Sequence, residues 1–310
     1  MCTCINLIGK NTYFGRNMDI DASFGEKIIF VPRNYKINFK KEKTLEKHYS
    51  ILGIGTVVND YPLFADSINE YGLGFAGLNF VNNAYYYKVD KNKENYAPYE
   101  LPLILLSTCK SIKDVKKLLK KINIVDIDFD KGIKNALLHF MIGDKNGSIV
   151  IETTLDGMKV YDNPFNVLTN NPPFPFHKEN VCNYMQLHND LPKNNLMKDY
   201  ELKSFCLNQG AISLPGDFSS PSRFIKCLYV KNNLVLNNDD TDIIQFFKCM
   251  DSVSMPLGSV KTEKYNANTY YTSCYNLNDG ALYYKTYFSN IKQIKIKMNS
   301  NQSELSIFDL

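Results

Sequence analysis

Consecutive β-strand patterns constrain the fold of this chain most, because strands that follow one another directly pair antiparallel. Over the first 90 residues, apolar and β-branched runs alternate with turn residues: CTCINLI, TYFGRNMDI, KIIFVP, YSILGIGTVV and LGFAGLNFV. The first two runs flank the turn sequence Gly9-Lys10-Asn11 and together predict a β-hairpin. The N-terminal part of the chain is therefore expected to form antiparallel sheet.

The spacing of the apolar residues changes to a helical period near residue 111. Ser111 and Asp114 have the spacing of a capping box. The apolar residues that follow lie on one face of a predicted helix, with lysines on the other: Ile112, Val115, Leu118, Leu119 and Ile122. Further helices are predicted near 177–190, at SRFIKCLYV after a Ser220-Pro221 start, and from Thr241.

Strand patterns return in ALLHFMIGDKNGSIVIETT, MKVYDNPFNVLTNN, TYYTSCYNL, ALYYKTYF and IKQIKIK. Within the first of these, Asn146-Gly147 marks a tight hairpin turn. Strands and helices thus come in blocks, which predicts an α+β fold with antiparallel sheets and helices layered on them. No shift in composition divides the chain, so residues 1–310 are expected to form a single domain.

Composition excludes several classes of protein. The chain has 310 residues, 44% of them hydrophobic, and its net charge of +4 is too small to indicate nucleic-acid binding. No window approaches the ~20 apolar residues that span a bilayer, and the N-terminus lacks a signal-peptide pattern. We therefore expect a cytoplasmic protein without membrane insertion, whose eight cysteines remain free thiols.

Cys2 follows the initiator methionine, and this position gives it chemistry that no other cysteine has. Methionine is commonly excised before a small residue, which would leave Cys2 with both a thiol and a free α-amino group. A thiolate is the effective nucleophile, and an α-amino group, whose ordinary pKa is about 8, can accept the thiol proton. One residue would then supply both nucleophile and base.

The predicted hairpin places two charged residues near this thiol. If its loop centres near Lys10, Cys2 lies opposite residues 17–19 of the return strand. Arg16 and Asp19 then lie close to the sulfur, where an arginine favours the thiolate and a carboxylate can hold the ammonium group. The same two residues at a strand end could equally form an ordinary surface ion pair.

Several further motifs support a catalytic interpretation: YFGRNMDI, VPRNY, YPLFADSINEYGLGFAGLNF, VLTNNP and LPGDFSSPSRF. With the initial MCT, and in this order and spacing, they resemble the choloylglycine hydrolase family from residue 1 to about residue 290. This family comprises bile salt hydrolases and penicillin V acylases, which are N-terminal-nucleophile amidases. The resemblance implies a four-layer αββα sandwich with antiparallel sheets and a reaction that needs no metal or organic cofactor.

The resemblance also implies roles for individual residues. Cys2 is similar to the family nucleophile, while Arg16 and Asp19 match the residues that flank the thiol and bind the α-amino group. Asn79, in GLNF, matches a residue of the oxyanion hole, and Asn170, in VLTN, matches an asparagine that contacts the amide or the tetrahedral centre.

Arg223, in SPSR, matches a second active-site arginine of the family. Taken singly, Asn79 and Asn170 could be turn residues and Arg223 a surface charge. Their joint occurrence at matching positions favours the functional interpretation.

The implied reaction is hydrolysis of the amide that joins a steroid acyl group to glycine or taurine. The Cys2 thiolate would attack the carbonyl, with Asn79 and a backbone N–H stabilising the oxyanion, and losing one such donor costs about 100- to 1000-fold in rate. The α-ammonium would protonate the leaving amine, and water would hydrolyse the thioester. Conjugated bile salts are therefore the expected substrates, and a homotetramer is the assembly that the resemblance implies.

Asn79 separates two branches of the family, because penicillin V acylases tend to carry tyrosine there and bile salt hydrolases asparagine. The chain is therefore similar to the bile salt hydrolases. The resemblance also suggests residues that line an apolar acyl pocket: Met18, Phe24, Val58, Ala65 and Phe129. Two loops, at 172–177 and 202–214, depart from the family pattern and are expected to alter substrate range or rate.

Three other interpretations remain open. The same nucleophile would serve for hydrolysis of another acyl amide, such as phenoxyacetyl penicillin or an N-acyl homoserine lactone. An inactive member of the family could bind amphipathic ligands. Cys2-Thr3-Cys4 could belong to a metal or redox site in a non-catalytic protein, although zinc needs further ligands at recognisable spacing and a Cys2–Cys4 bridge has poor geometry.

Overall fold

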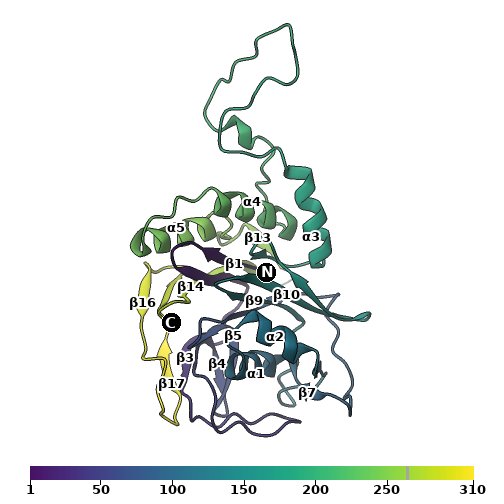
Figure 1. Ribbon diagram of the computed structural model, residues 1–310, viewed down its shortest axis with the longest axis vertical. Coiled ribbons are helices and arrows are strands. Elements are labelled where there is room, and N and C mark those ends of the chain that lie inside the picture. Colours follow the sequence, from purple (N-terminus) through teal and green to yellow (C-terminus); the bar gives the residue numbers. More distant parts are fainter. Residues whose placement is uncertain (263–264) are drawn as a thin grey trace.

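Two large antiparallel β-sheets lie face to face in the centre of the molecule, and helices cover the outer face of each (Figure 1). The structure is a computed structural model that describes residues 1–262 and 265–310. The first sheet contains, in spatial order, β12 (Val167–Leu168), β1 (Cys2–Ile8), β2 (Thr12–Ile20), β14 (Asn266–Asn276), β15 (Leu282–Thr286) and β16 (Lys292–Ile294), and β13 (Val260–Lys261) pairs with β14.

The second sheet has eight strands among the described residues. In spatial order these are β11 (Gly157–Asp162), β10 (Gly147–Thr154), β9 (Leu138–Asp144), β6 (Gly74–Asn79), β5 (Tyr61–Asn69), β4 (Ile51–Val58), β3 (Lys27–Val31) and β17 (Ser306–Asp309). A separate parallel pair is formed by β7 (Glu94–Tyr96) and β8 (Ile122–Ile124).

Helices complete the layers on both sides. The second sheet is covered by α1 (Leu101–Thr108), which follows the short helix η1 (Pro98–Glu100), and by α2 (Ile112–Leu119). The first sheet is covered by α4 (Ser220–Asn232) and α5 (Asp239–Asp251), while α3 (Phe174–Asn180), η2 (Val181–Tyr184) and η3 (Gln209–Ala211) lie between β12 and α4 in the chain. This order of layers is αββα, and it confirms the predicted α+β fold with antiparallel sheets.

Strand β3 shows why apolar runs in this chain are nearly continuous. Ile28 and Phe30 belong to the core that contains β1 and β2, whereas Ile29 and Val31 belong to the core that contains α1. Successive side chains of a strand point to opposite faces. A strand that lies between two layers therefore needs apolar residues at every position rather than at alternate ones.

The first two strands form the hairpin that the turn sequence predicts. Cys2 pairs with Met18 and Ile8 pairs with Thr12, which is within the register expected from a loop centred near Lys10. On the other side of β1, Cys4 pairs with Leu168 of β12. The start of β1 therefore lies in the interior of the first sheet, between β2 and the segment that leads to Asn170.

Several helix boundaries differ from the sequence prediction. Helix α2 begins as expected, with the Ser111 hydroxyl accepting a hydrogen bond from the Asp114 amide, but it ends at Leu119. Ile122 lies in β8, because a three-residue apolar strand and one more turn of an amphipathic helix have the same pattern over so short a stretch. The helix expected near 177–190 instead spans 174–180 and continues as a short 3-10 turn to residue 184.

The two helices over the first sheet begin one or two residues before their predicted starts. Ser219, not Ser220, is the N-cap of α4, and Asn238 caps α5, which begins at Asp239 rather than at Thr241. Helix α1 is buried on all sides and has no helical period for a sequence analysis to detect.

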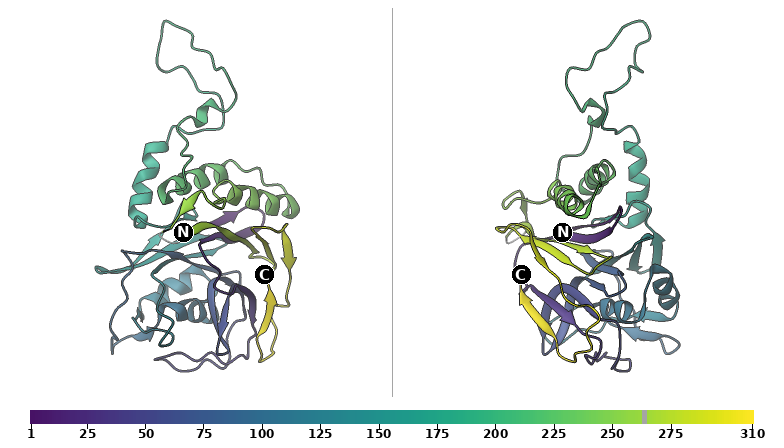
Figure 2. Two further views of the ribbon diagram at one scale, coloured as in Figure 1. Left: turned by 180° about the vertical axis from the view of Figure 1, so that it is seen from behind. Right: turned by 60° about the vertical axis from the view of Figure 1, so that its left-hand side comes forward.

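A long loop leaves the body of the molecule between η2 and α4 (Figure 2). We call residues 185–219 the projecting segment. Leu196, Phe205 and Leu207 are 84–85% exposed in it. Other exposed apolar side chains of the projecting segment are Met185, Leu191, Met197, Tyr200, Leu202 and Ile212.

None of the described helices combines the length and the hydropathy that crossing a bilayer requires.

Candidate active site

Cys2 lies at the first position of β1 and is only 4% exposed, yet it lines a cavity of about 500 Å³. Its sulfur accepts a hydrogen bond from Nη2 of Arg16, which comes from the neighbouring strand β2. Nη1 of the same guanidinium donates to the carbonyl oxygens of Gly77 and Ala65, the latter at 3.3 Å. Strands of both sheets therefore hold the cation against the sulfur.

Arg16 is completely buried, and its charge is compensated locally. Burial by itself lowers the pKa of an arginine, but the neighbouring Cys2 sulfur and the Asp66 carboxylate raise the pKa of Arg16 above its ordinary value. The guanidinium is therefore permanently charged, and it favours the thiolate form of a sulfur that it touches.

The Asn170 side chain makes three hydrogen bonds around the start of β1. Its Oδ1 accepts from the backbone nitrogen of Cys2 at 2.7 Å and from Nη2 of Arg223 at 2.8 Å. Its Nδ2 donates to the carbonyl oxygen of Asn79 at 2.8 Å. A single side chain thus joins the nitrogen of Cys2, the second arginine and the end of β6.

Arg223 reaches the same point from α4, where it is 1% exposed. Its Nη1 lies 2.5 Å from the carbonyl oxygen of Cys2 and 2.6 Å from Oγ1 of Thr3. Its Nε donates to the carbonyl oxygen of Phe218 at 3.0 Å. The side chain is part of the interior, so the alternative of a surface charge is wrong.

Asp19 lies beside the N-terminal residues. Its backbone groups bond both ends of Met1: its carbonyl oxygen accepts from the terminal ammonium at 2.6 Å, and its amide donates to the Met1 carbonyl at 3.1 Å. Oδ1 accepts from the Thr269 hydroxyl at 2.6 Å, and Oδ2 lies 3.8 Å from Nη1 of Arg223. Burial raises the pKa of Asp19, and Arg223 opposes that rise.

Oδ2 of Asp19 is buried and accepts no hydrogen bond from the described residues. An unsatisfied buried carboxylate oxygen is costly, so a cation that reaches it is bound favourably. The sequence analysis expects this carboxylate to hold the α-ammonium group of Cys2.

Asn79 ends β6 at the edge of the same cavity and is exposed. Its Oδ1 accepts from the backbone nitrogen of Val81 at 3.3 Å. This bond uses the acceptor of the amide, and the amide nitrogen remains as a donor for a ligand in the cavity.

Two buried histidines hold the backbone around Asn170. Nε2 of His177 lies 2.9 Å from the carbonyl oxygen of Asn170, and Nε2 of His139 lies 3.0 Å from that of Thr169. Burial lowers the pKa of His177 to about 4, so its ring is neutral at pH 7 and donates a hydrogen bond. His177 comes from the 172–177 loop, which the sequence analysis interpreted as a departure from the family pattern without assigning His177 a role.

The cavity beside Cys2 is mainly apolar, and four of the five residues predicted for the acyl pocket line it: Met18, Phe24, Ala65 and Phe129. Val58, the fifth predicted pocket residue, does not line this cavity. Thr56, two residues earlier on β4, lines the cavity instead. Side chains two apart share one face of a strand, so Val58 points the same way but lies one repeat beyond the cavity.

One wall of the cavity comes from a stretch that the sequence analysis did not single out. Residues 133–138, the last of which begins β9, line the cavity together with Pro98, Tyr99 and Pro102. The stretch has no motif or periodicity that distinguishes it from an ordinary loop, and only the packing of the second sheet brings it to the site.

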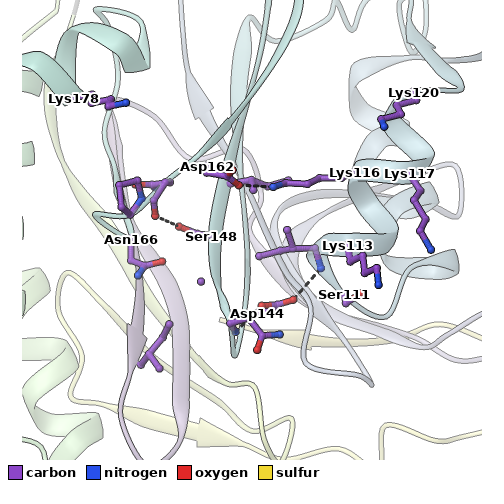
Figure 3. Close-up of a pocket in the computed structure, with 17 residues that line it drawn as sticks. Ser111, Lys113, Lys116, Lys117, Lys120, Asp144, Ser148, Asp162, Asn166 and Lys178 are labelled. Carbon is purple, nitrogen blue, oxygen red and sulfur yellow. Dashed lines mark hydrogen bonds and ion pairs between the residues drawn. The ribbon is translucent and has the colours of Figure 1, made fainter.

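A larger cavity, of about 1030 Å³, lies beside α2 (Figure 3). Lysines of α2 and Lys178 of α3 surround it; Lys116 pairs with Asp162, and a carboxylate oxygen of Asp144 accepts from the Ile112 amide. The described residues that line this cavity include no predicted site residue. Its size alone therefore does not identify it as the reactive site.

The donor set for a metal ion is missing from the described residues, which contain no cluster of three or more His, Cys, Asp or Glu. Cys2 and Cys4 are both free thiols, and burial raises the pKa of the Cys4 thiol. The interpretation of Cys2-Thr3-Cys4 as a metal or disulfide site therefore has no structural support.

Two facing antiparallel sheets between helical layers, with a cysteine at the second position of the chain, define the class of protein. Residues 2–308 match the family model described as "Linear amide C-N hydrolases, choloylglycine hydrolase family". The chain belongs to this family, as the sequence motifs indicated.

Particular relatives are also similar over nearly the whole chain. A bile salt hydrolase/transferase of Clostridium perfringens is 43% identical over 298 residues, covering 94% of this chain and 90% of that protein. A bile salt hydrolase/transferase of Lactiplantibacillus plantarum is 41% identical over 290 residues, covering 93% and 89%.

Solved structures show the same fold. The C2A mutant of the conjugated bile acid hydrolase from Clostridium perfringens superimposes with a TM-score of 0.91 at 40% identity, covering 100% of this chain and 97% of that one. Penicillin V acylase from Agrobacterium tumefaciens, at 17% identity, has a TM-score of 0.78 and covers 99% of this chain and 91% of its own, which is a likeness of fold. The chain therefore has the N-terminal-nucleophile hydrolase fold that the resemblance implied.

Proposed function

We propose that this chain is a bile salt hydrolase, which cleaves the amide bond of glycine- or taurine-conjugated bile salts through Cys2. The observation that carries the proposal is the position of the Cys2 sulfur, which touches the buried Arg16 guanidinium and lines an apolar cavity. Family membership supports amide hydrolysis, and the two curated relatives described above, named as bile salt hydrolase/transferases, support the substrate class.

In the proposed reaction, Met1 is removed first, so that Cys2 carries a free α-amino group. The thiol proton passes to this amine, and the sulfur attacks the carbonyl carbon of the substrate amide. As the tetrahedral intermediate collapses, the carbon–nitrogen bond breaks, and the leaving glycine or taurine nitrogen takes the proton from the α-ammonium. Water activated by the same amine then hydrolyses the thioester.

Other site residues hold these groups in place. In the proposed reaction, Asn170 and the Asp19 carboxylate would bind the free α-amine of Cys2, whose backbone nitrogen lies 2.7 Å from Asn170 Oδ1. Arg223 holds the Cys2 carbonyl at 2.5 Å, which fixes the residue from its other end. The Asn79 amide nitrogen and a backbone N–H would stabilise the oxyanion.

The cavity suits a steroid acyl group because it is mainly apolar and has a volume of about 500 Å³, which is within the range of ligand sites. Met18, Phe24, Ala65 and Phe129 supply apolar surface for the rings. No metal or organic cofactor takes part in the proposed reaction.

Assembly and location complete the proposal. We infer a homo-oligomer, a tetramer by resemblance to the family, because the projecting segment exposes large apolar side chains that a second copy could cover. We infer a cytoplasmic location, in which all eight cysteines, free in the structure, would stay reduced.

Amine release from taurocholate and glycocholate, measured together with the intact mass of the same preparation, tests the proposal. Release of taurine or glycine by protein that lacks Met1 is expected. If protein without Met1 releases neither amine, bile salt hydrolysis is wrong, and release of phenoxyacetate from penicillin V would identify the alternative acylase.

An uncleaved N-terminal extension provides a second test, because it converts the proposed base into an amide. The extended protein is expected to lose activity by about 1000-fold or more while its melting temperature stays the same. An extended protein with full activity would contradict the role of the α-amine.

Asn79→Tyr tests the choice of acyl group. The larger side chain at the cavity edge is expected to lower the rate on taurocholate relative to penicillin V. An unchanged ratio of the two rates would show that this position does not select the acyl group.

A further inference from the structure

Asp66 is a buried acid that lies behind the nucleophile and has no part in the reaction proposed above. It is in β5 and has no exposed surface. Its Oδ1 accepts from the hydroxyl of Tyr271 at 2.6 Å, and its Oδ2 accepts from the hydroxyl of Tyr275 at 2.9 Å. Both tyrosines come from β14 of the opposite sheet, so these bonds cross the interface between the two sheets.

The neighbour of opposite charge is Arg16. Nη1 of Arg16 donates to the carbonyl oxygen of Ala65, the residue before Asp66, at 3.3 Å, while Nη2 of the same group touches the Cys2 sulfur. Burial raises the pKa of Asp66, and the charge of Arg16 and the two phenol donors oppose the rise. One guanidinium therefore touches the reactive sulfur, bonds to the residue before Asp66, and acts on the Asp66 carboxylate through its charge.

Formal charges around the guanidinium balance only if Asp66 is counted. In the chain without Met1 the positive groups are Arg16, Arg223 and the α-ammonium, and the negative groups are Asp19, Asp66 and the Cys2 thiolate. The other titratable groups near Asp66 are a thiol and two phenols whose pKa burial raises: Cys4, Tyr271 and Tyr275. Ile54 and Ala76, its partners on the adjacent strands, carry no charge.

We propose that Asp66 is a positioning residue whose negative charge shares the Arg16 cation with the Cys2 sulfur and so sets the pH at which that sulfur ionises. The inference rests on the proposed function only in taking Cys2 as the reactive group. With Asp66 ionised, the cluster is neutral when Cys2 is a thiolate and its amine is protonated. Without that charge, Arg16 has one counter-charge fewer, and the thiolate becomes more favourable.

The sign of the effect follows from this balance. Replacing Asp66 by the isosteric asparagine makes the cluster one unit more positive at every pH at which Asp66 is ionised. The thiolate then forms at lower pH, and the α-ammonium loses its proton more easily. A role limited to packing or hydrogen bonding has no reason to move either titration in this direction.

Alkylation of Cys2 by iodoacetamide, measured from pH 4 to 10, tests the proposal. In this reaction the thiolate forms a sulfur–carbon bond, iodide leaves, and the thiol proton goes to solvent. The tryptic peptide ending at Lys10 contains both Cys2 and Cys4, so fragment ions must separate the two sites. The exposed Cys182 and Cys206 lie in other peptides and do not interfere.

Asp66→Asn is expected to lower the pH midpoint of Cys2 alkylation by on the order of one pH unit. The matched control is Asp144→Asn. It removes another buried carboxylate, at the C-terminal end of β9, and should leave the midpoint unchanged. An unchanged or raised midpoint in Asp66→Asn would overturn the proposal, and so would an equal shift in both variants.

A double variant keeps the proposal testable if Asp66→Asn does not fold. Adding Arg16→Gln removes the uncompensated cation, so the double variant is expected to show a cooperative melting transition where Asp66→Asn alone shows none, or to melt at a higher temperature if both fold. A double variant that is no more stable would overturn the proposal.

The alkylation test is independent of bile salt turnover. If the expected shift is observed in a protein that releases no amine from taurocholate, the charge balance holds and the proposed substrate is wrong. If turnover is observed and the midpoint does not shift, the proposed function holds and the role of Asp66 is wrong.

Discussion

Charged side chains are usually exposed and apolar side chains usually buried. The start of β1 departs from this rule by burying charges, and the projecting segment departs from it by exposing apolar side chains. Around Cys2, the charged side chains of Arg16, Asp19 and Arg223 are 0–1% exposed, and hydrogen bonds and ion pairs join them to both sheets and to α4. In the projecting segment, Phe205 and Leu207 are 84–85% exposed.

The difference shows which parts of the molecule one copy of the chain completes. Buried charges are tolerated only when partners satisfy them, and at the start of β1 the partners come from the same chain. Exposed apolar side chains have no such partner within the described part of the chain. We therefore expect changes at the two regions to alter different measurements.

The two regions should differ most in how their substitution changes the rate of taurocholate hydrolysis. Cys2→Ser should lower taurocholate hydrolysis by about 1000-fold or more, because a hydroxyl is far less acidic than a thiol. Phe205→Ser, in the projecting segment, should change the rate of taurocholate hydrolysis by no more than about twofold. Amine release and melting temperature of both variants provide the measurement, and an active Cys2→Ser protein would remove Cys2 as the nucleophile.

A smaller loss of activity is expected from Asn170→Ala. This change removes the acceptor for the nitrogen of Cys2 and for Arg223, together with the donor to the Asn79 carbonyl. We expect kcat to fall by about 100- to 1000-fold, comparable to the loss of one preorganised active-site contact. A change confined to KM would show that Asn170 binds substrate without orienting the nucleophile.

The projecting segment should respond in its state of assembly. Replacing Leu196, Phe205 and Leu207 together by serine removes the three most exposed apolar side chains of the segment, so the protein should shift to a smaller species in sedimentation velocity. Replacing the exposed lysines Lys193, Lys198 and Lys203 of the same segment by serine is the control. The proposed homo-oligomer is wrong if the original chain already sediments as a monomer.

The smallest expected effect concerns the stability of the buried site as pH falls. Burial lowers the pKa of His177 from its ordinary 6.5 to about 4. Between these two values the unfolded chain binds more protons than the folded chain, so the free energy of unfolding falls as the pH falls from about 6.5 to 4. The contribution is fully present above pH 6.5, and its size is on the order of 3 kcal/mol.

Urea unfolding of the original chain and of His177→Gln at pH 7, 6, 5 and 4 measures this contribution of His177 to the free energy of unfolding. Subtracting the two curves removes the opposite contributions of buried carboxyl groups whose pKa is raised, such as Asp19. The difference should grow more favourable to the glutamine variant at each step down in pH. Parallel curves would show that His177 does not titrate in this range.

Local pattern was sufficient for the hairpin and for half of the candidate site. A short turn fixes the pairing of the two strands it joins, so the position of Arg16 and Asp19 near Cys2 follows from residue numbers alone. The same logic predicted the β9–β10 hairpin at Asn146-Gly147, which the structure confirms. Short-range pairing depends on few residues, and those residues are adjacent in the sequence.

Pattern alone was insufficient where packing decides the outcome. Val58 has the apolar character of a pocket residue, but the length of β4 carries it past the cavity. Helix α1 lacks a polar face because both the second sheet and neighbouring loops cover it. Asp66 is one acid among many in the sequence, and only the packing of β5 against β14 brings it to the Tyr271 hydroxyl and near the charge of Arg16.

Sequence patterns alone were enough to predict the layered α+β fold, the family, and a thiol flanked by an arginine and an aspartate at the start of the chain. Tertiary structure alone decided that Asn170 and Arg223 meet Cys2, from 168 and 221 residues away, and that residues 133–138 close the cavity. The difference lies in the sequence separation of the contacting residues, because strand pairing across a short turn depends only on residues that are near one another in the chain. Contacts between distant segments exist only after the two sheets and their helices have packed around a common core.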